Sequence, residues 1–245
     1  MRKLVECVPN FSEGRDRSVI DSITEAITSV EGIKLLNVDM GFDTNRTVVT
    51  FAGDADIVVE AGFRGMAKAV ELIDMSRQTG EHPRMGGTDV FPFIPLSGVS
   101  AEECLSLAEE LASRVGKELS IPVFLYAKSA KKKERVRLPD IRDGEYEALE
   151  EKLKSSGFKP DYGPALFNAK AGVTAIGVRD FLLAYNINLS TRDKKIASDI
   201  ALTVREKGRA KRDGKGVIVR DKEGKAVKVP GRLSNCQAGG WYIDE

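Results

Sequence analysis

The sequence predicts an α+β protein whose first part is a ferredoxin-like β-α-β-β-α-β unit. Short runs of β-branched and aromatic residues alternate, between residues 4 and 126, with stretches in which apolar residues recur at helical spacing. The order of the first six elements matches the split βαβ arrangement, in which an antiparallel sheet carries helices on one face. The chain has 245 residues, 42% of them hydrophobic, which is enough for one large core or two small ones.

The first four elements follow from local patterns. Residues 4–8 form a β-rich run that enters a turn at 9–14. A helix follows, because apolar residues recur at helical spacing at Val19, Ile20, Ile23, Ala26 and Ile27. Two further β-rich runs, 33–38 and 46–51, are separated by a polar turn at 41–45, so we expect them to pair as antiparallel neighbours.

A long helix and a proline-containing strand come next. Asp54 and Asp56 mark the start of the helix, and an apolar stripe continues from Val58 to about Met75. Residues 89–96 are almost all apolar and include two prolines. Since proline cannot donate to a sheet ladder, this run suits an edge strand or a bulge.

The next elements are two helices and a strand. Ser100 and Glu103 form a capping box that opens a helix to about Glu118. Residues 121–126 predict another strand, and the charged stretch 145–154 predicts a further helix. The predicted order up to residue 126 is therefore β-α-β-β-α-β-α-β.

Glycine and proline at 157–164 interrupt regular structure, so a domain boundary belongs near this point or shortly after it. We assign residues 1–180 to a first subdomain and 181–245 to a second, partial one. The second part of the chain predicts strands at 172–178 and 181–189, a helix capped by Thr191 and ended by Gly208, a hairpin at 217–229 that turns at Glu223 and Gly224, and a last strand near 240–243.

Composition excludes several classes of protein. Lys and Arg number 38 against 37 Asp and Glu, so the net charge of +1 gives no reason to expect nucleic acid as a partner. No apolar stretch approaches the roughly 18 residues of a membrane helix, and no signal peptide is recognisable, so we expect a cytoplasmic protein. Cys7, Cys104 and Cys236 are far apart, which argues against a disulfide framework or a zinc site.

Basic residues gather in two segments. One comprises Lys128, Lys131, Lys132, Lys133, Arg135 and Arg137, and the other spans residues 205–225. Solvated surface is the usual explanation of such runs. The alternative is that they draw a small polyanion into a cleft.

His82 is the only histidine of the chain, and it lies in the loop sequence GEHPRMGG at residues 80–87. Histidine is the one side chain whose ordinary pKa lies between about 5 and 8, so it can accept a proton from one group and return it to another. His82 is therefore the first candidate for proton chemistry. The alternative is a histidine that only satisfies a hydrogen bond in a turn.

Four segments together resemble the motifs of the glutamate formiminotransferase family. They are VECVPNFSEG at 5–14, DTNRTV at 43–48, GEHPRMG at 80–86 and FLLAYNINL at 181–189. The resemblance runs in order from residue 4 to about 208 and resumes from 230 to 242. Several long motifs in register are more specific than one short pattern.

The resemblance implies transfer of a formimino group between N5 of tetrahydrofolate and the amino group of L-glutamate. It also implies two related ferredoxin-like subdomains with a folate-binding tunnel between them, usually within a homodimer, and His82 as the catalytic acid and base. Tetrahydrofolate is then a co-substrate, and no metal is required. The folate-binding stretch of the family matches residues Gly163, Pro164, Ala165, Leu166, Phe167, Asn168, Ala169, Lys170, Ala171 and Gly172.

This chain departs from the family pattern in two places. Residues 208–230 carry an additional basic hairpin, and family members continue past the point at which this sequence ends, so the second ferredoxin-like subdomain is expected to be incomplete here. Either the sequence is a fragment or a partner chain covers the open sheet edge. Two other functions therefore stay open: formyl transfer from 5-formyltetrahydrofolate to glutamate on the same site, and folate binding without catalysis.

Two charged residues near the motifs have competing interpretations. Asp39 could orient the imidazole of His82 or hold an ammonium group, or it could be a solvent-facing turn residue. Arg84 could bind a substrate carboxylate or serve a structural role.

Overall fold

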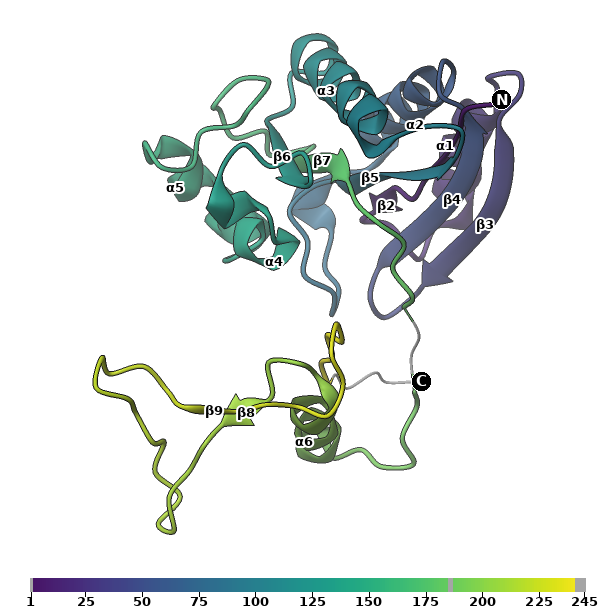
Figure 1. The fold of residues 1–245 in the computed structure, drawn as a ribbon. Coiled ribbons are helices and arrows are strands. Elements are labelled where there is room, and N and C mark those ends of the chain that lie inside the picture. Colours follow the sequence, from purple (N-terminus) through teal and green to yellow (C-terminus); the bar gives the residue numbers. More distant parts are fainter. Residues whose placement is uncertain (1, 185–186, 241–245) are drawn as a thin grey trace. The chain divides into compact units, whose positions relative to one another are not determined.

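The structure is a computed structural model that describes residues 2–184 and 187–240. The chain divides into two units, residues 1–182 and residues 183–245 (Figure 1). Within the described residues no helix combines the length and the apolar character that crossing a membrane requires.

The first unit is built on one mixed sheet of seven strands, which confirms the α+β class. The strands are β1 (Leu4–Cys7), β2 (Asn10–Phe11), β3 (Lys34–Gly41), β4 (Arg46–Asp54), β5 (Thr88–Ser97), β6 (Val123–Ala127) and β7 (Thr174–Val178). β3 pairs with β4, β4 with β1 and β2, and these two with β5, all antiparallel. Beyond β5 the sheet continues with β7 and β6 in parallel pairing, so it is larger than a four-stranded ferredoxin-like sheet. The ferredoxin-like description stays a prediction for both units.

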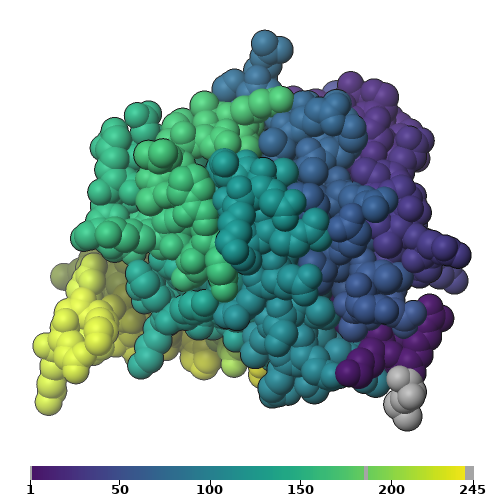
Figure 2. Space-filling model, turned by 90° about the horizontal axis from the view of Figure 1, so that it is seen from above, coloured from purple at the N-terminus to yellow at the C-terminus, as the bar shows by residue number. Residues whose placement is uncertain are grey.

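Helices lie on both faces of the sheet. They are α1 (Arg17–Thr28), α2 (Val58–Leu72), α3 (Ala101–Glu118), α4 (Leu138–Ile141) and α5 (Leu149–Lys154). The first three pack on one face over a core that includes Phe51, Phe91 and Phe93, and Figure 2 shows them side by side. α4 and α5 contribute to a second cluster around Phe124 on the opposite face.

A side-chain cap explains where α3 begins, whereas α2 begins without one. The predicted capping box of α3 is confirmed: Glu103 N–H donates to Ser100 Oγ at 3.1 Å, and Ser100 N–H donates to the Glu103 carboxylate at 2.8 Å. α2 begins instead after Ile57, which provides no side-chain cap. Asp54 forms an ion pair with Arg2 at 2.7 Å rather than capping that helix.

β5 lies in the interior of the sheet, so the edge-strand interpretation of its prolines is wrong and the bulge interpretation is confirmed. Opposite β2 the register passes from Val90 to Thr88 in one step, which makes Asp89 the extra residue of a bulge. Pro92 still takes part in the sheet through its carbonyl oxygen, which accepts the Val8 N–H at 3.2 Å. Opposite β1 the register passes from Pro95 to Ser97 in one step, so a second bulge, at Leu96, lies beside the other proline.

The second unit has one helix and a two-stranded sheet in its described residues. α6 (Lys194–Val204) is confirmed, but its cap is Asp193, whose carboxylate accepts from Lys195 N–H, and not Thr191. β8 (Arg209–Ala210) pairs with β9 (Lys228–Val229), and the hairpin between them turns at 221–224 as predicted. The strand predicted at 181–189 is absent from 181–184 and 187–189, and most of the strand predicted at 240–243 lies outside the described residues.

Candidate active site

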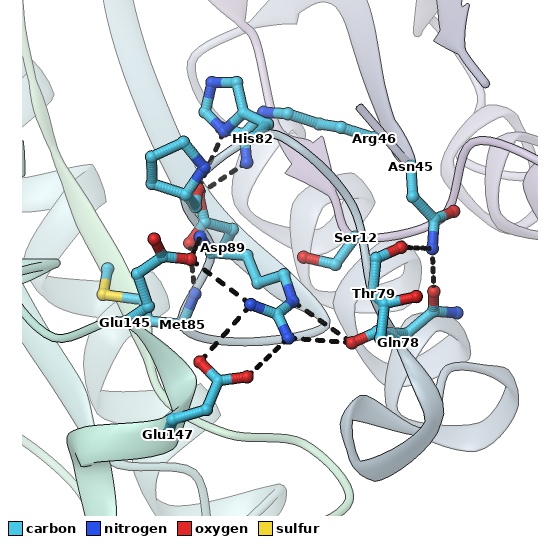
Figure 3. Close-up of polar contacts among 12 residues, drawn as sticks. Ser12, Asn45, Arg46, Gln78, Thr79, His82, Met85, Asp89, Glu145 and Glu147 are labelled. Carbon is cyan, nitrogen blue, oxygen red and sulfur yellow. Dashed lines mark hydrogen bonds and ion pairs between the residues drawn. The ribbon is translucent and has the colours of Figure 1, made fainter. Parts of the chain in front are cut away.

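Three of the motifs, distant in sequence, meet around the loop that carries His82 (Figure 3). Ser12 donates from Oγ to the carbonyl of Gly86 at 2.8 Å. The Asn45 side-chain oxygen accepts from Gly14 N–H at 2.9 Å, and its amide nitrogen donates to Thr79 O at 3.0 Å. Hydrogen bonds from the motifs at 5–14 and 43–48 therefore hold both ends of the His82 loop.

His82 is partly buried in this loop, and a backbone group orients its ring. Nδ1 lies 2.7 Å from the carbonyl oxygen of Pro83. A carbonyl can only accept, so Nδ1 carries the proton and Nε2 of the neutral ring is free to accept one. Asp39 is exposed on β3 opposite Val48, and the partner of Nδ1 is Pro83 instead.

The surroundings of His82 favour the neutral imidazole. Burial, followed by the charge of Arg46 and then that of Arg142, lowers the pKa of His82 from 6.5 to about 4. The hydrogen bond to Pro83 and the charge of Asp89 act in the opposite direction but do not compensate. At neutral pH the side chain is therefore a base with an available lone pair.

We expect the single histidine signal in a proton–carbon NMR spectrum to titrate near pH 4 in the folded protein. The unfolded chain binds this proton at higher pH, near 6.5. Between these values the unfolded state holds more protons than the folded state, so the free energy of unfolding falls as the pH is lowered from about 6.5 to about 4. His82→Gln removes this part of the pH dependence of the free energy of unfolding. A folded-state titration near pH 6.5 would contradict the arrangement.

Next to His82 lies a buried group of charges that sequence analysis did not identify. The Asp89 carboxylate is fully buried and accepts from Arg46 Nη1 at 2.7 Å and from Arg142 Nη2. Its other oxygen accepts from Met85 N–H at 2.9 Å, which ties the group to the His82 loop. Arg46 lies in the motif at 43–48 and Asp89 begins a run of apolar residues, so both were visible in the sequence as charges where a strand was predicted.

Arg84 has a structural role in this site. Its guanidinium pairs with Glu147 at 2.7 Å and with Glu145 at 3.3 Å, and it also donates to the carbonyl of Gln78 at 2.9 Å (Figure 3). These contacts connect the two ends of the loop to the short helical turn at 146–148. Its side chain is therefore already neutralised and is not the free cation that a substrate carboxylate would need.

The stretch 163–172 reaches the His82 loop only at its end. Gly172 and Gly86 form a β-bridge, and Val173 N–H donates to Met85 O at 2.9 Å. Tyr146 joins the two segments, since its N–H donates to Arg84 O at 2.9 Å and its hydroxyl donates to Ala169 O at 2.6 Å. The beginning of the stretch lies elsewhere, because Gly163 packs against the backbone of Ile121.

Gly86 lies where no side chain fits. A Cβ atom there would stand 2.0 Å from Val173 O and 2.9 Å from Ala171 O. We expect Gly86→Ala to lower the free energy of unfolding by about 1–3 kcal/mol or more, because the backbone must move to relieve the overlap. Gly157→Ala is the matched control, since nothing lies within 4 Å of its Cβ position. Equal urea midpoints for the two variants would refute this packing.

The first basic segment is largely neutralised by neighbouring carboxylates. Arg135 is buried and pairs with Asp161 at 2.7 Å, and Lys128 pairs with Asp180 at 2.5 Å. The second segment belongs to the other unit. In the part of the chain that the structure describes, no three His, Cys, Asp or Glu side chains are grouped closely enough to hold a metal ion.

Comparison with known proteins assigns the family. Residues 4–179 match the family model described as the N-terminal subdomain of the formiminotransferase domain, and residues 184–245 match the formiminotransferase domain itself. The chain belongs to the formiminotransferase family. The three motifs around His82 are thus elements of a formiminotransferase fold, and the fourth, at 181–189, spans the junction of the two matches.

Individual relatives are up to nearly half identical to this chain over the aligned residues. A formimidoyltransferase-cyclodeaminase of Sus scrofa is 49% identical over 246 residues, covering 100% of this chain and 42% of the relative. Glutamate formimidoyltransferases of Thermoplasma acidophilum and Streptococcus pyogenes serotype M1 are 49% and 43% identical, covering 83% and 85% of this chain and 68% and 70% of the relatives. The chain therefore spans less than half the length of the cyclodeaminase-containing relative and about two thirds of the other two.

Proposed function

We propose that this formiminotransferase transfers a formimino group between 5-formimidoyltetrahydrofolate and L-glutamate, with His82 as the general acid and base. The observation that carries the proposal is the free Nε2 of a neutral His82 at the point where three family motifs meet. The names of the relatives support it, because two of them are glutamate formimidoyltransferases.

The reaction requires two proton movements that one imidazole can serve. When an amine attacks the formimino carbon, a new C–N bond forms and the nitrogen must lose a proton, which Nε2 accepts. Breaking the other C–N bond of the tetrahedral intermediate then leaves a nitrogen that must gain a proton, which the imidazolium returns. No net proton is taken up, and no oxidant or reductant is needed. Burial, Arg46 and Arg142 make the imidazolium a stronger acid than usual, which favours the return.

The stretch 163–172 is the proposed folate-binding segment. The bridge between Gly172 and Gly86 and the hydrogen bond from Gly87 N–H to Ala171 O support the proposal, since they bring the end of the segment to the His82 loop. The folate tunnel, the homodimer and the cytoplasmic location stay predictions.

The test compares two donors on the full chain. 5-Formimidoyltetrahydrofolate and 5-formyltetrahydrofolate are each incubated with L-glutamate, and the N-substituted glutamate products are quantified. We expect turnover of the formimino donor to exceed that of the formyl donor. Preference for the formyl donor would replace the proposed reaction, and saturable folate binding by calorimetry without turnover of either donor would reduce the chain to a folate-binding protein.

A further inference from the structure

The buried charges beside His82 do not balance. Two guanidinium groups, Arg46 and Arg142, share the single carboxylate of Asp89, and this is the one ion pair that either arginine makes among the described residues. The exposed fractions of the three side chains are 8%, 12% and 0%. A positive charge in excess is costly in such a place, because buried charges require a partner of opposite sign.

The hydrogen bonds of the group are also incomplete. Nε of Arg142 is buried and has no acceptor within the described part of the chain. Nε of Arg46, in contrast, donates to Asn10 Oδ1 at 3.1 Å. Arg142 therefore keeps one donor to Asp89 and has a second, Nε, that the described residues leave without a partner, although an arginine fork is well suited to bind a carboxylate.

The pKa shifts at this cluster fit an uncompensated positive charge. Burial lowers the pKa of Arg46, and the charge of Arg142 lowers it further, against the effect of Asp89. Burial raises the pKa of Tyr126 to about 12, although the charges of Arg179 and Arg142 act to lower it, so the phenol contributes no negative charge. Among the described residues Asp89 is the one carboxylate that pairs with Arg46 or Arg142, and the two arginines share it.

We propose that Arg142, together with Arg46, forms the subsite that binds the α-carboxylate of the amino-acid substrate beside His82. This inference rests on the proposed function. In an amino acid the α-carboxylate and the reacting nitrogen are attached to the same carbon. A cation next to the catalytic imidazole can therefore contact the α-carboxylate while the amine lies beside His82. The carboxylates of a folate are separated from N5 by the aminobenzoyl group, so they do not reach this position while N5 reacts.

The chemical consequence is specificity for a substrate that carries its negative charge next to the amine. The carboxylate neutralises the excess charge of the cluster, and Asp89 holds both guanidinium groups in place for it. Binding of the anion also removes part of the electrostatic effect that lowers the pKa of His82. The occupied subsite therefore makes His82 a better base than it is in the free protein.

The experiment uses the single histidine as a reporter of binding, independent of turnover. The His82 signal of the full chain is titrated by NMR alone, with saturating glutarate, and with glutaramide as the uncharged control. We expect glutarate to raise the pKa of His82 by about one unit or more, and glutaramide to leave it unchanged. In Arg142→Gln the pKa of His82 rises without a ligand and the response to glutarate disappears. An unchanged pKa with glutarate in the native protein overturns the proposal.

The KM for glutamate and the Kd for folinic acid then distinguish a subsite for the amino acid from one for the folate. We expect Arg142→Gln to raise the KM for glutamate by about 10- to 100-fold while the Kd for folinic acid stays within about two-fold, because one charged hydrogen-bonded contact is lost. Arg142→Lys, which keeps the charge and removes the fork, recovers part of the loss. Arg77→Gln is the control, since Arg77 is 85% exposed and lies outside the cluster. A rise in the folinic acid Kd with an unchanged KM for glutamate would overturn the proposal.

The two proposals fail in different ways. A response of His82 to glutarate without any transfer activity leaves the carboxylate subsite standing and removes the proposed function. Transfer activity without a response to glutarate keeps the function and removes the subsite.

Discussion

His82→Gln is expected to lower kcat for formimino transfer by about 10²- to 10⁴-fold, the usual contribution of a positioned acid and base. Glutamine keeps the polar character of the position but cannot exchange a proton. The loop should keep its conformation, because its ends are held by Ser12 and Asn45 and not by the imidazole. Initial rates at saturating donor and acceptor, with circular dichroism of each variant, measure the effect.

The pH profile gives a second signature of the same residue. For a base whose pKa is about 4 in the free protein, kcat/KM is expected to be constant above roughly pH 5 and to fall in more acidic solution. His82→Gln loses this acid limb along with the rate. Glu81→Gln, at the exposed neighbouring position, serves as the control and keeps both. Turnover of His82→Gln within a few-fold of the native rate would exclude catalysis by the imidazole.

Locally determined features of the fold were predictable from the sequence. The capping box of Ser100 and Glu103 involves residues three positions apart, and it forms as predicted. β7 was predicted as a strand, but its place between β5 and β6 depends on pairings with strands far away in the chain. The strand predicted at 181–189 failed in its described residues, because β-propensity reports suitability for a sheet and does not provide a neighbouring strand.

In the candidate site, too, the local feature was predictable from the sequence and the feature that depends on long-range pairing was not. His82 was identifiable because it is the only histidine, and its loop has a recognisable motif. Asp89 was not, because its role depends on the bulge opposite β2, which places its carboxylate against arginines from β4 and from the end of α4. Bulges of this kind reorient side chains next to active sites, and their position is set by long-range register rather than by local composition.

Asp89→Asn is expected to lower the free energy of unfolding by about 3–5 kcal/mol, because it leaves two buried guanidinium groups without their counter-ion. Asp54→Asn is the matched control. It removes one exposed ion pair, with Arg2, so a far smaller change than that of Asp89→Asn is expected. Urea unfolding followed by circular dichroism measures both, and hydrogen exchange at the Met85 amide, which donates to Asp89, reports the local effect.

The pH dependence and a double variant distinguish charge from packing. Burial raises the pKa of Asp89, but Arg46 and Arg142 together lower it below its ordinary value. The stabilisation by this carboxylate is then complete above the unfolded-state pKa, near 4, and is lost as the pH falls through the lower folded-state pKa. Asp89→Asn should remove that acid dependence. Adding Arg142→Gln to it should recover part of the stability, because one of the two unpaired cations is gone; a larger loss in the double variant would mean that packing, and not charge, determines the stability of this cluster.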